Sequence, residues 1–252
     1  MKSVFLSGGA REQALSYLLH KGEDVIAVVT PRPSESNRRF EKVVTTAIEN
    51  DIPVISVDRH DVATKLAELQ FDLLISCGFP FILGADVLSC VQHAINVHPT
   101  LLPKYRGPRS GAFVVMNGET ETGVTVHRIT EGTDDGDILE QARIPVSPFD
   151  TTKSLYRKCR DLEPKLLYRV VCRLRSGTQT SAPQDESEAT IYPQIRVPKD
   201  SEIDPRKTML ELWNEIRACD PDDYPAFFVI HGQKVCIRLW RPEKPEDEFD
   251  LI

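Results

Sequence analysis

The first half of the sequence alternates apolar runs with helical segments, and this alternation restricts the fold more than any other feature. We expect strands at residues 2–9, 24–30, 52–57 and 71–78, which are mostly apolar or β-branched. The segments 11–22, 38–50 and 61–69 between them have the length and apolar spacing of helices. Continuous apolar strands that alternate with helices indicate a parallel sheet covered on both faces. The sequence therefore predicts an α/β fold with a Rossmann-like open, mostly parallel sheet.

The second half has a different pattern. We expect a short helix at 110–118, strands at 122–129 and 135–146, and a long helix at 151–177 that is interrupted near Pro164. From Gly177 to Ile191 the composition shifts to Ser, Thr, Gln, Glu and Pro, which indicates a mobile surface loop or linker. A helix at 205–219 and a β-hairpin at 224–241 with a His-Gly turn follow. We divide the chain into a main domain (1–176), a linker (177–206) and a C-terminal helix with a hairpin (207–252).

Charge and cysteine usage restrict the partners and the compartment. The 252 residues carry a formal net charge of −7, which argues against a chain whose main task is to grip tRNA or DNA, although a local basic patch remains compatible. The six cysteines form no close Cys-x-x-Cys pair, and the chain opens on a strand without a signal peptide. We therefore expect reduced thiols, a cytoplasmic protein and no zinc site. No apolar run is long enough to span a bilayer, so we expect no membrane association.

The stretch AINVHPTLLPKYRG, residues 94–107, places two polar side chains on an apolar run. Because residues i and i+2 of a strand point to the same face, Asn96 and His98 are expected to project together. Pro99 cannot continue a central strand, so the pair should lie at the carboxyl end of the strand. In open α/β sheets this edge is where ligands bind.

A second stretch, NGETETGVTVHRITEGTDDGDILEQ, holds an acidic loop from Glu131 to Asp137 between two expected strands. Taken singly, an Asp in such a loop is usually an ordinary solvated turn residue. Its occurrence together with Asn96 and His98 favours a functional role.

Together the two stretches resemble the 10-formyltetrahydrofolate-dependent formyltransferase family. The family pattern is Asn-x-His-Pro-Ser/Thr-Leu-Leu-Pro, then Asn-Gly-x-x-x-Thr-Gly-Val-Thr, then Asp-x-Gly, and it matches residues 95–140 almost without a gap, with weaker similarity from residue 1 to about 230. The resemblance implies that Asn96, His98 and Asp134 are catalytic. The Asp-x-Gly register favours Asp134 over Asp135, because Asp134 stands two residues before Gly136.

The chemistry implied by the resemblance explains these residue types. Transfer of a formyl group from a folate nitrogen to an amine develops negative charge on the formyl oxygen, which donors such as the Asn96 amide and a protonated His98 can stabilise. A nearby carboxylate, Asp134, would favour the imidazolium and could relay the proton of the amine through water. No covalent intermediate and no metal are required.

The resemblance also implies binding residues. The loop 77–88 would hold the pterin ring of the folate, although Phe81 and Leu83 could instead be core residues at a strand end. The expected folate-binding residues are Gly78, Phe79, Pro80, Phe81, Ile82, Leu83, Ile129, Thr133 and Asp137. The expected substrate-binding residues are Lys104, Tyr105, Arg106, Gly8 and Gly9. Arg106 could equally cap its loop, Gly8 and Gly9 could either meet a phosphate or only shape a turn, and we expect His93, His127 and His231 to be structural or surface residues.

Within the family, the C-terminal helix and hairpin favour one branch. Glycinamide ribonucleotide formyltransferases resemble only the main domain, and methionyl-tRNA formyltransferases carry a longer basic barrel, whereas sugar N-formyltransferases resemble the whole arrangement. We therefore expect formylation of a nucleotide-linked amino sugar, a 4-amino-4,6-dideoxy sugar of surface-glycan or O-antigen biosynthesis. The alternatives are a methionyl-tRNA formyltransferase and a catalytically silent folate- or nucleotide-binding protein. Apolar residues of the hairpin also predict a homodimer, unless they pack back on the main domain.

Overall fold

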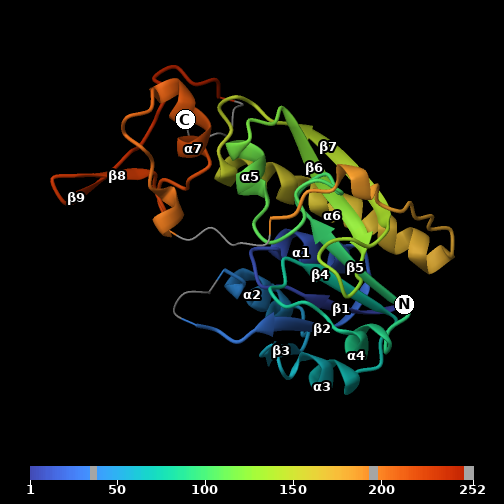
Figure 1. Cartoon of the computed structure of the whole chain (residues 1–252). Coiled ribbons are helices and arrows are strands. Elements are labelled where there is room, and N and C mark those ends of the chain that lie inside the picture. Colours follow the sequence, from blue (N-terminus) through green and yellow to red (C-terminus); the bar gives the residue numbers. More distant parts are fainter. Residues whose placement is uncertain (35–38, 193–197, 247–252) are drawn as a thin grey trace.

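The computed structural model describes residues 1–34, 39–192 and 198–246. Part of the expected linker (193–197) and most of the acidic tail (247–252) therefore lie outside the described residues, as do residues 35–38. The main domain is built on a seven-stranded sheet with the order β3-β2-β1-β4-β5-β6-β7 (Figure 1). The strands are β1 (Lys2–Leu6), β2 (Asp24–Pro31), β3 (Val54–Val57), β4 (Leu73–Cys77), β5 (His93–His98), β6 (Glu121–Arg128) and β7 (Ile138–Pro145).

The direction of the strands confirms the expected fold. Strands β3, β2, β1, β4 and β5 run parallel, whereas β6 is antiparallel to β5 and β7 is antiparallel to β6. The result is a Rossmann-like, mostly parallel open sheet. The carboxyl ends of the five parallel strands lie at one edge, where this architecture places ligands.

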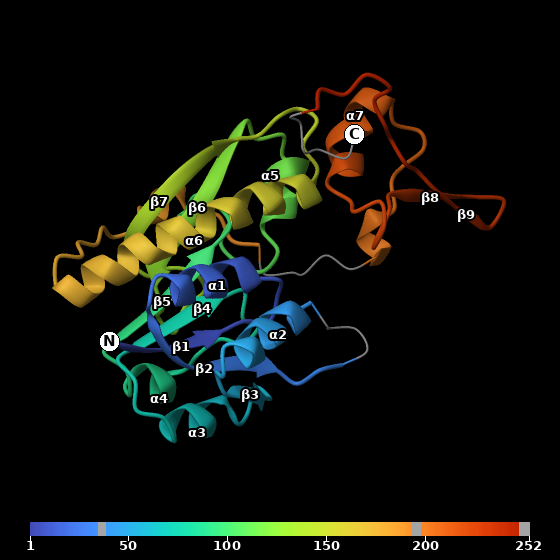
Figure 2. The ribbon, with the colours of Figure 1, turned by 180° about the vertical axis from the view of Figure 1, so that it is seen from behind.

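Helices cover both faces of the sheet. The helices are α1 (Glu12–His20), α2 (Glu41–Glu49), α3 (Val62–Ala67), α4 (Ala85–Leu88), α5 (Gly111–Met116) and α6 (Thr152–Ser176). Figure 2 shows α1, α2 and α6 in front of the sheet. Successive residues of β1 face opposite sides, so Phe5 joins the core under α1 and α6, while Val4 and Leu6 join the core under α3 and α4. All three side chains are fully buried, which explains why the strands read as continuous apolar runs.

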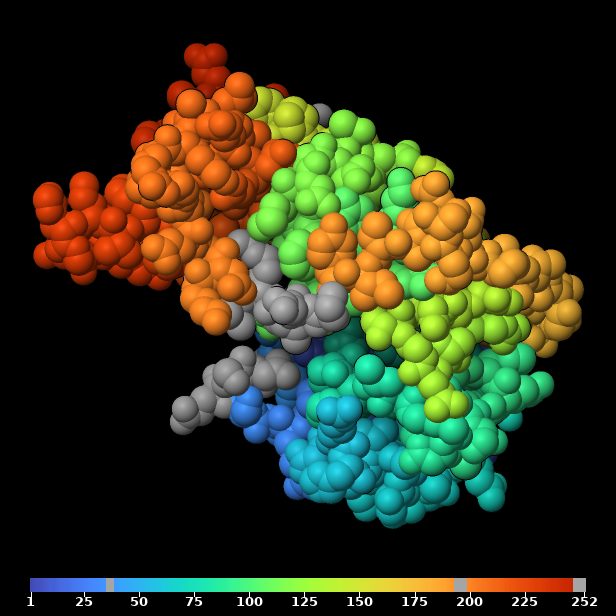
Figure 3. Space-filling view, in the orientation of Figure 1, coloured from blue at the N-terminus to red at the C-terminus, as the bar shows by residue number. Residues whose placement is uncertain are grey.

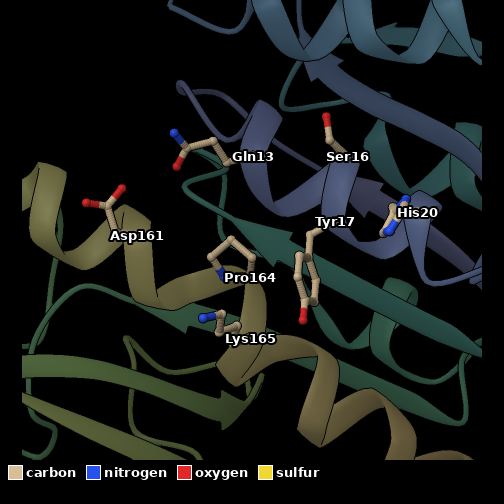
Figure 4. A pocket seen from close by; sticks show the side chains of 7 residues that line it. All are labelled: Gln13, Ser16, Tyr17, His20, Asp161, Pro164 and Lys165. Atoms are coloured by element: carbon tan, nitrogen blue, oxygen red, sulfur yellow. The ribbon is translucent and has the colours of Figure 1, made fainter.

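The long helix α6 runs unbroken for 25 residues through Pro164, so the expected interruption there is wrong. Proline removes one backbone hydrogen bond, at a cost of about 3 kcal/mol. Leu166, Leu167 and Val170, which follow it, are buried against the sheet, and burial of one such side chain contributes about 1.5–3 kcal/mol. The packing of the helix therefore outweighs the break. Beside Pro164, a shallow groove of about 460 Å³ lies between α1 and α6 and is lined by Tyr17, as Figure 4 shows.

The segment after α6 is on the surface, as expected, but it is held against the main domain. Ala182 bridges to Ile138 of β7, and Ile191 bridges to Arg106. A short 3₁₀ helix, η1 (Glu186–Glu188), lies between these bridges. Figure 3 shows this segment, in orange, lying across the green and yellow-green surface of the main domain.

The C-terminal part is a small module of its own. It contains η2 (Pro198–Ser201), α7 (Met209–Arg217) and the antiparallel strands β8 (Phe227–Ile230) and β9 (Gln233–Cys236). His231 and Gly232 form the two-residue turn of the hairpin, as predicted, and both have a positive φ. The module docks on the main domain through Trp213, whose indole N–H donates to Pro148 O at 2.9 Å, and through Arg217, which donates to Asp150 O at 2.9 Å. Among the described residues, no helix has the length and apolarity needed to cross a membrane.

Candidate active site

The carboxyl end of β5 brings two of the predicted site residues together. Asn96 and His98 lie on the same face of β5, and the strand ends where Pro99 follows. The neighbouring strand β6 pairs antiparallel with β5, so that His127 stands opposite Asn96 and Thr125 stands opposite His98. The pairing fixes the distance between the two strands and therefore the position of both side chains.

Asp134 completes the cluster from the loop between β6 and β7. Its carboxylate accepts a hydrogen bond from Asn96 Nδ2 at 3.3 Å and from the Gly107 N–H at 2.9 Å, and it lies 3.4 Å from His98 Nδ1. Asp134 has a φ of +51°, a left-handed conformation that Asp tolerates better than most residues. The neighbouring Asp135 instead accepts from the hydroxyl of Thr130, outside this cluster. The predicted choice of Asp134 over Asp135 thus agrees with the geometry.

His127 belongs to the cluster as well, although we expected it to be a structural or surface residue. Its Nδ1 lies 2.8 Å from Arg128 O, so Nδ1 carries the proton and donates to this carbonyl. Its Nε2 lies 3.0 Å from Asn96 Nδ2 and 3.4 Å from Asp134 Oδ1, and the side chain is buried. The alternation of β6 indicates on which face His127 lies, but it does not indicate that His127 stands opposite Asn96.

Burial sets the protonation of the two central groups. Burial lowers the pKa of His98 below its usual value, and the opposing attraction of Asp134 does not restore it. Burial acts to raise the pKa of Asp134, but the positive charge that His98 and His127 can carry and the Gly107 N–H outweigh it and hold this pKa well below its usual range. Asp134 is therefore ionised, and His98 is neutral near pH 7, contrary to the expectation of a protonated His98.

The hydrogen bonds of His98 identify the atom that can gain a proton. Its Nε2 lies 2.8 Å from Tyr105 O, which can only accept, so Nε2 carries the proton of the neutral ring. The hydroxyl of Ser110 lies 3.2 Å from the same nitrogen. Nδ1 is then the basic atom, and it faces the Asp134 carboxylate. The site can accept a proton at Nδ1 and stabilise the resulting charge.

Four of the expected folate-binding residues form an apolar wall after β4 and β6, the strands on either side of β5. The rings of Phe79 and Phe81 meet edge to face at 5.2 Å, and both pack with Leu83 and Ile129 in the core under α3 and α4. Ile82, by contrast, is 61% exposed. Gly78 has a φ of +69°, which favours glycine. Of the three remaining residues, Asp137 accepts from Ser181 Oγ at 2.9 Å, Thr133 is half-buried next to Asp134, and Pro80 is exposed.

The expected substrate-binding residues have internal partners. Arg106 is 2% exposed, and its guanidinium donates to Gln184 Oε1 and to both carboxylate oxygens of Glu186. Of the two roles expected for Arg106, these contacts favour the one in which it fixes its loop over the one in which its charge binds the substrate. The Gly8 N–H donates to Gly78 O at 3.1 Å. A Cβ at Gly8 would lie 2.7 Å from Pro80 Cδ, so this glycine shapes a tight contact between two loops.

The other three residues of this group also make contacts within the chain. The Gly9 N–H is directed at Ser7 Oγ, at 3.5 Å. The Tyr105 hydroxyl donates to Glu119 at 2.6 Å, and Lys104, which is exposed, pairs with Glu188 at 3.6 Å. Lys104 is thus the member of the group that is open to solvent.

One group of possible metal ligands occurs among the described residues, away from the cluster. Asp58, His60 and Asp61 follow β3 and have ligand atoms within 4.8 Å of one another. Arg32 forms ion pairs with Asp58 at 2.6 Å and with Asp61 at 3.0 Å. Its guanidinium therefore neutralises the negative charge that would attract a metal cation. The six cysteines are all free thiols.

The contact between Asp134 and His98 has a measurable consequence. Replacement Asp134→Asn removes the negative charge that raises the pKa of His98, so this pKa should fall further below its value in the wild-type protein. The measurement is a titration of the His98 ring by nitrogen-15 NMR. Asp135→Asn is the matched control and should leave the pKa of His98 unchanged. An unchanged or raised pKa in Asp134→Asn would contradict the pairing.

Comparisons with known proteins agree with this geometry. The model of the formyl transferase family matches residues 1–171. A methionyl-tRNA formyltransferase of Lactobacillus delbrueckii subsp. bulgaricus is 32% identical over 262 residues, which is 100% of this chain and 82% of the relative. Among solved structures, a 4-N formyltransferase from Francisella tularensis has a TM-score of 0.77 at 24% identity, covering 94% of this chain and 96% of the other.

A second solved structure is the N-formyltransferase from Helicobacter canadensis in complex with folinic acid and dTDP-3-aminofucose. It has a TM-score of 0.73 at 22% identity, covering 93% of this chain and 85% of the other. At these identities the two structures establish the shared fold. The family match extends over more than half of the chain and includes all three clustered residues. The chain belongs to the formyltransferase family and is a formyltransferase.

Proposed function

We propose that the chain transfers a formyl group from 10-formyltetrahydrofolate to the amine of a nucleotide-linked amino sugar, a 4-amino-4,6-dideoxy sugar. The observation that carries the proposal is the assembly of Asn96, His98 and Asp134 at the carboxyl end of β5. The Asp134 carboxylate accepts a hydrogen bond from Asn96 and lies within ion-pairing distance of His98. The reaction belongs in the cytoplasm, and its product would serve a surface glycan such as the O antigen.

The apolar wall fits the proposed formyl donor. A pterin ring has apolar faces and polar edges, and Phe79, Phe81 and Ile129 form an apolar surface beside exposed backbone at Gly78. Exposed Ile82 supplies further apolar area that a ring could cover. The complex of the Helicobacter canadensis enzyme with folinic acid is consistent with this assignment. The donor supplies the formyl carbon at which the amine of the acceptor attacks.

His98 acts in this reaction as the proton acceptor. Attack by the amine leaves a proton to be removed, and Nδ1 of neutral His98 is the basic atom at the site. Asp134 stabilises the imidazolium that forms, because it lies 3.4 Å from Nδ1 and stays ionised. The charged His98 can then return the proton to the leaving nitrogen.

Asn96 must change its hydrogen bonds to act as a donor to the formyl oxygen. Its amide hydrogens are directed at His127 Nε2 and Asp134 Oδ1. Rotation of the amide about its Cβ–Cγ bond would point Nδ2 at the substrate and Oδ1 at His127. This rotation gives up the hydrogen bonds of Nδ2 to His127 Nε2 and Asp134 Oδ1, which hold the amide in its present orientation. His127 is thus proposed to control the orientation of the Asn96 amide.

Two observations favour a sugar acceptor over tRNA. The Francisella tularensis enzyme, described as a 4-N formyltransferase, matches along 96% of its length. The net charge of −7 also disfavours a large nucleic-acid partner. Methionyl-tRNA formylation is the second candidate, because a methionyl-tRNA formyltransferase is 32% identical over the whole chain.

The catalytic roles predict the effect of three substitutions. Asn96→Ala, His98→Ala and Asp134→Ala should each lower kcat about 100-fold or more, because each removes a donor, a base or its counter-charge from a buried site. Asp135→Ala, which removes a neighbouring carboxylate outside the cluster, should retain near wild-type activity. Circular dichroism checks that each variant is folded. Retention of more than about a tenth of the wild-type rate by His98→Ala would contradict its role.

The acceptor can be identified by measuring release of tetrahydrofolate by reverse-phase chromatography. We expect release from 10-formyltetrahydrofolate in the presence of a nucleotide-linked 4-amino sugar, less with a 3-amino sugar, and none with initiator methionyl-tRNA. The His98→Ala variant controls for release without catalysis. Release with methionyl-tRNA alone would establish the second candidate instead.

The hairpin supports a proposal about assembly. Val229, Ile230 and Val235 are 49%, 51% and 38% exposed, and Figure 1 shows β8 and β9 projecting away from the main domain. Phe228, by contrast, packs into the small core of the module. A two-stranded hairpin is marginal in water, and its exposed apolar residues would be covered by the same element of a second chain. We therefore propose a homodimer formed through β8 and β9.

Sedimentation velocity at micromolar concentration tests the dimer. The wild-type chain should sediment as a dimer and Ile230→Lys as a monomer, because a charged side chain cannot be buried at the interface without a partner. Ile48→Lys replaces an isoleucine that is also exposed, on α2, and should remain dimeric. A wild-type monomer would refute the proposal.

A further inference from the structure

The segment 182–192, called the strap below, follows α6 and contacts both loops that hold the catalytic cluster. Its run from Ala182 to Glu188 is exposed except at Gln184, which is half-buried. The polar atoms of a half-buried side chain need hydrogen-bond partners within the protein, because water reaches them less easily. The partners of Gln184 are the loop of Asp134 and the loop of Arg106.

Gln184 binds the loop of Asp134 directly. Its amide nitrogen donates to Asp134 O at 2.8 Å and to Gly136 O at 2.7 Å. These two carbonyls flank the left-handed turn at Asp134, where φ is +51°. A non-glycine residue keeps such a conformation only when its surroundings hold it. The two hydrogen bonds therefore fix the backbone from which the Asp134 carboxylate projects.

Arg106 fixes Gln184 in turn. Its Nε and Nη2 donate to Gln184 Oε1 at 3.1 Å and 2.8 Å, so the orientation of the Gln184 amide is set and its nitrogen must face the carbonyls. The guanidinium also pairs with Glu186. All donors and acceptors of the Gln184 amide are thereby used.

The other end of the strap fixes the loop that contacts His98. The Arg106 N–H donates to Thr190 O at 2.8 Å, and the Tyr192 N–H donates to Arg106 O at 2.9 Å. Tyr105 O accepts from His98, and the Gly107 N–H donates to Asp134, so both neighbours of Arg106 hold a catalytic side chain. Tyr105 and Gly107 have φ of +62° and +105°. The strap thus holds the unusual backbone on both sides of the site.

We infer that Gln184 is a positioning residue for formyl transfer, which holds the Asp134 loop so that the carboxylate faces His98. The inference rests on the proposed catalytic role of Asp134. It assigns to the strap a function that its composition does not reveal. The hydrogen bonds of Gln184 end on Arg106 and on the backbone of Asp134 and Gly136, so we assign its effect to the position of Asp134.

The main test is Gln184→Met, which keeps the length of the side chain and removes both its donor and its acceptor. We expect kcat to fall about 10- to 100-fold, with KM for donor and acceptor changed less than about twofold, because the catalytic group is displaced and substrate contacts are kept. Gln184→Glu keeps the acceptor for Arg106 and loses the donor, and should be as slow as Gln184→Met.

Gln179→Met is the matched control, at a glutamine between the end of α6 and the strap. Gln179 also accepts from an arginine, Arg173, at 2.9 Å and donates to a backbone carbonyl, Leu139 O, at 3.0 Å, but this carbonyl belongs to β7. The Gln179→Met variant should therefore keep the wild-type kcat. Equal losses in Gln179→Met and Gln184→Met would show that the chain after α6 only stabilises the fold and would overturn the inference.

Two further measurements separate positioning from stability. In an Asp134→Asn chain, adding Gln184→Met should change kcat less than about twofold. If the double variant instead loses activity by the product of the two single losses, the residues act independently and the inference is overturned. In the acceptor-free protein, nitrogen-15 NMR should show a lower pKa of His98 in Gln184→Met, because Asp134 has moved away. Asp134 and His127 are the titratable groups that face His98. This measurement needs no acceptor, so it tests the strap even if the proposed sugar substrate is wrong.

Discussion

The half-buried Asp134 carboxylate is the constraint on which the arrangement of the site depends. A carboxylate that is removed from water must be compensated by donors or opposite charge, or it becomes protonated. In this protein the donors are the side chain of Asn96 and the backbone of Gly107, and the charge can be supplied by His98. Because these groups come from a strand and from two loops, the position of one carboxylate determines how three segments meet.

The sequence predicts the parts of this arrangement that depend on periodicity and on local chemistry. Continuous apolar strands separated by helices indicate the parallel sheet, and the spacing of Asn96 and His98 before Pro99 places them at the end of a strand. Resemblance to a family supplies the register of Asp134. The failed prediction of a break at Pro164 is also instructive, because the local cost of proline was outweighed by burial along the rest of α6.

The remaining parts of the site depend on pairings between distant residues. His127 enters the cluster through the register of β6 against β5, which no local pattern specifies. From the sequence, Arg106 can be interpreted as a cation that binds the substrate. Its contacts with Gln184 and Glu186, about 80 residues away, indicate another role. The neutral state of His98 likewise follows from burial, which depends on the complete fold. Sequence patterns identify candidate residues more readily than they identify the charges of these residues.

The expected boundary at residue 176 separates segments that the structure joins. Gln184, Thr190 and Tyr192 lie in the expected linker, yet their hydrogen bonds end on the loops of Asp134 and Arg106. Polar composition indicated mobility because exposed polar residues usually gain little from a fixed conformation. In this segment the polar groups make hydrogen bonds with backbone atoms of the loops that carry Asp134 and Arg106. The same composition that disfavours a hydrophobic core therefore suits a segment whose partners are carbonyls and N–H groups. These contacts join the segment to the main domain as far as Tyr192.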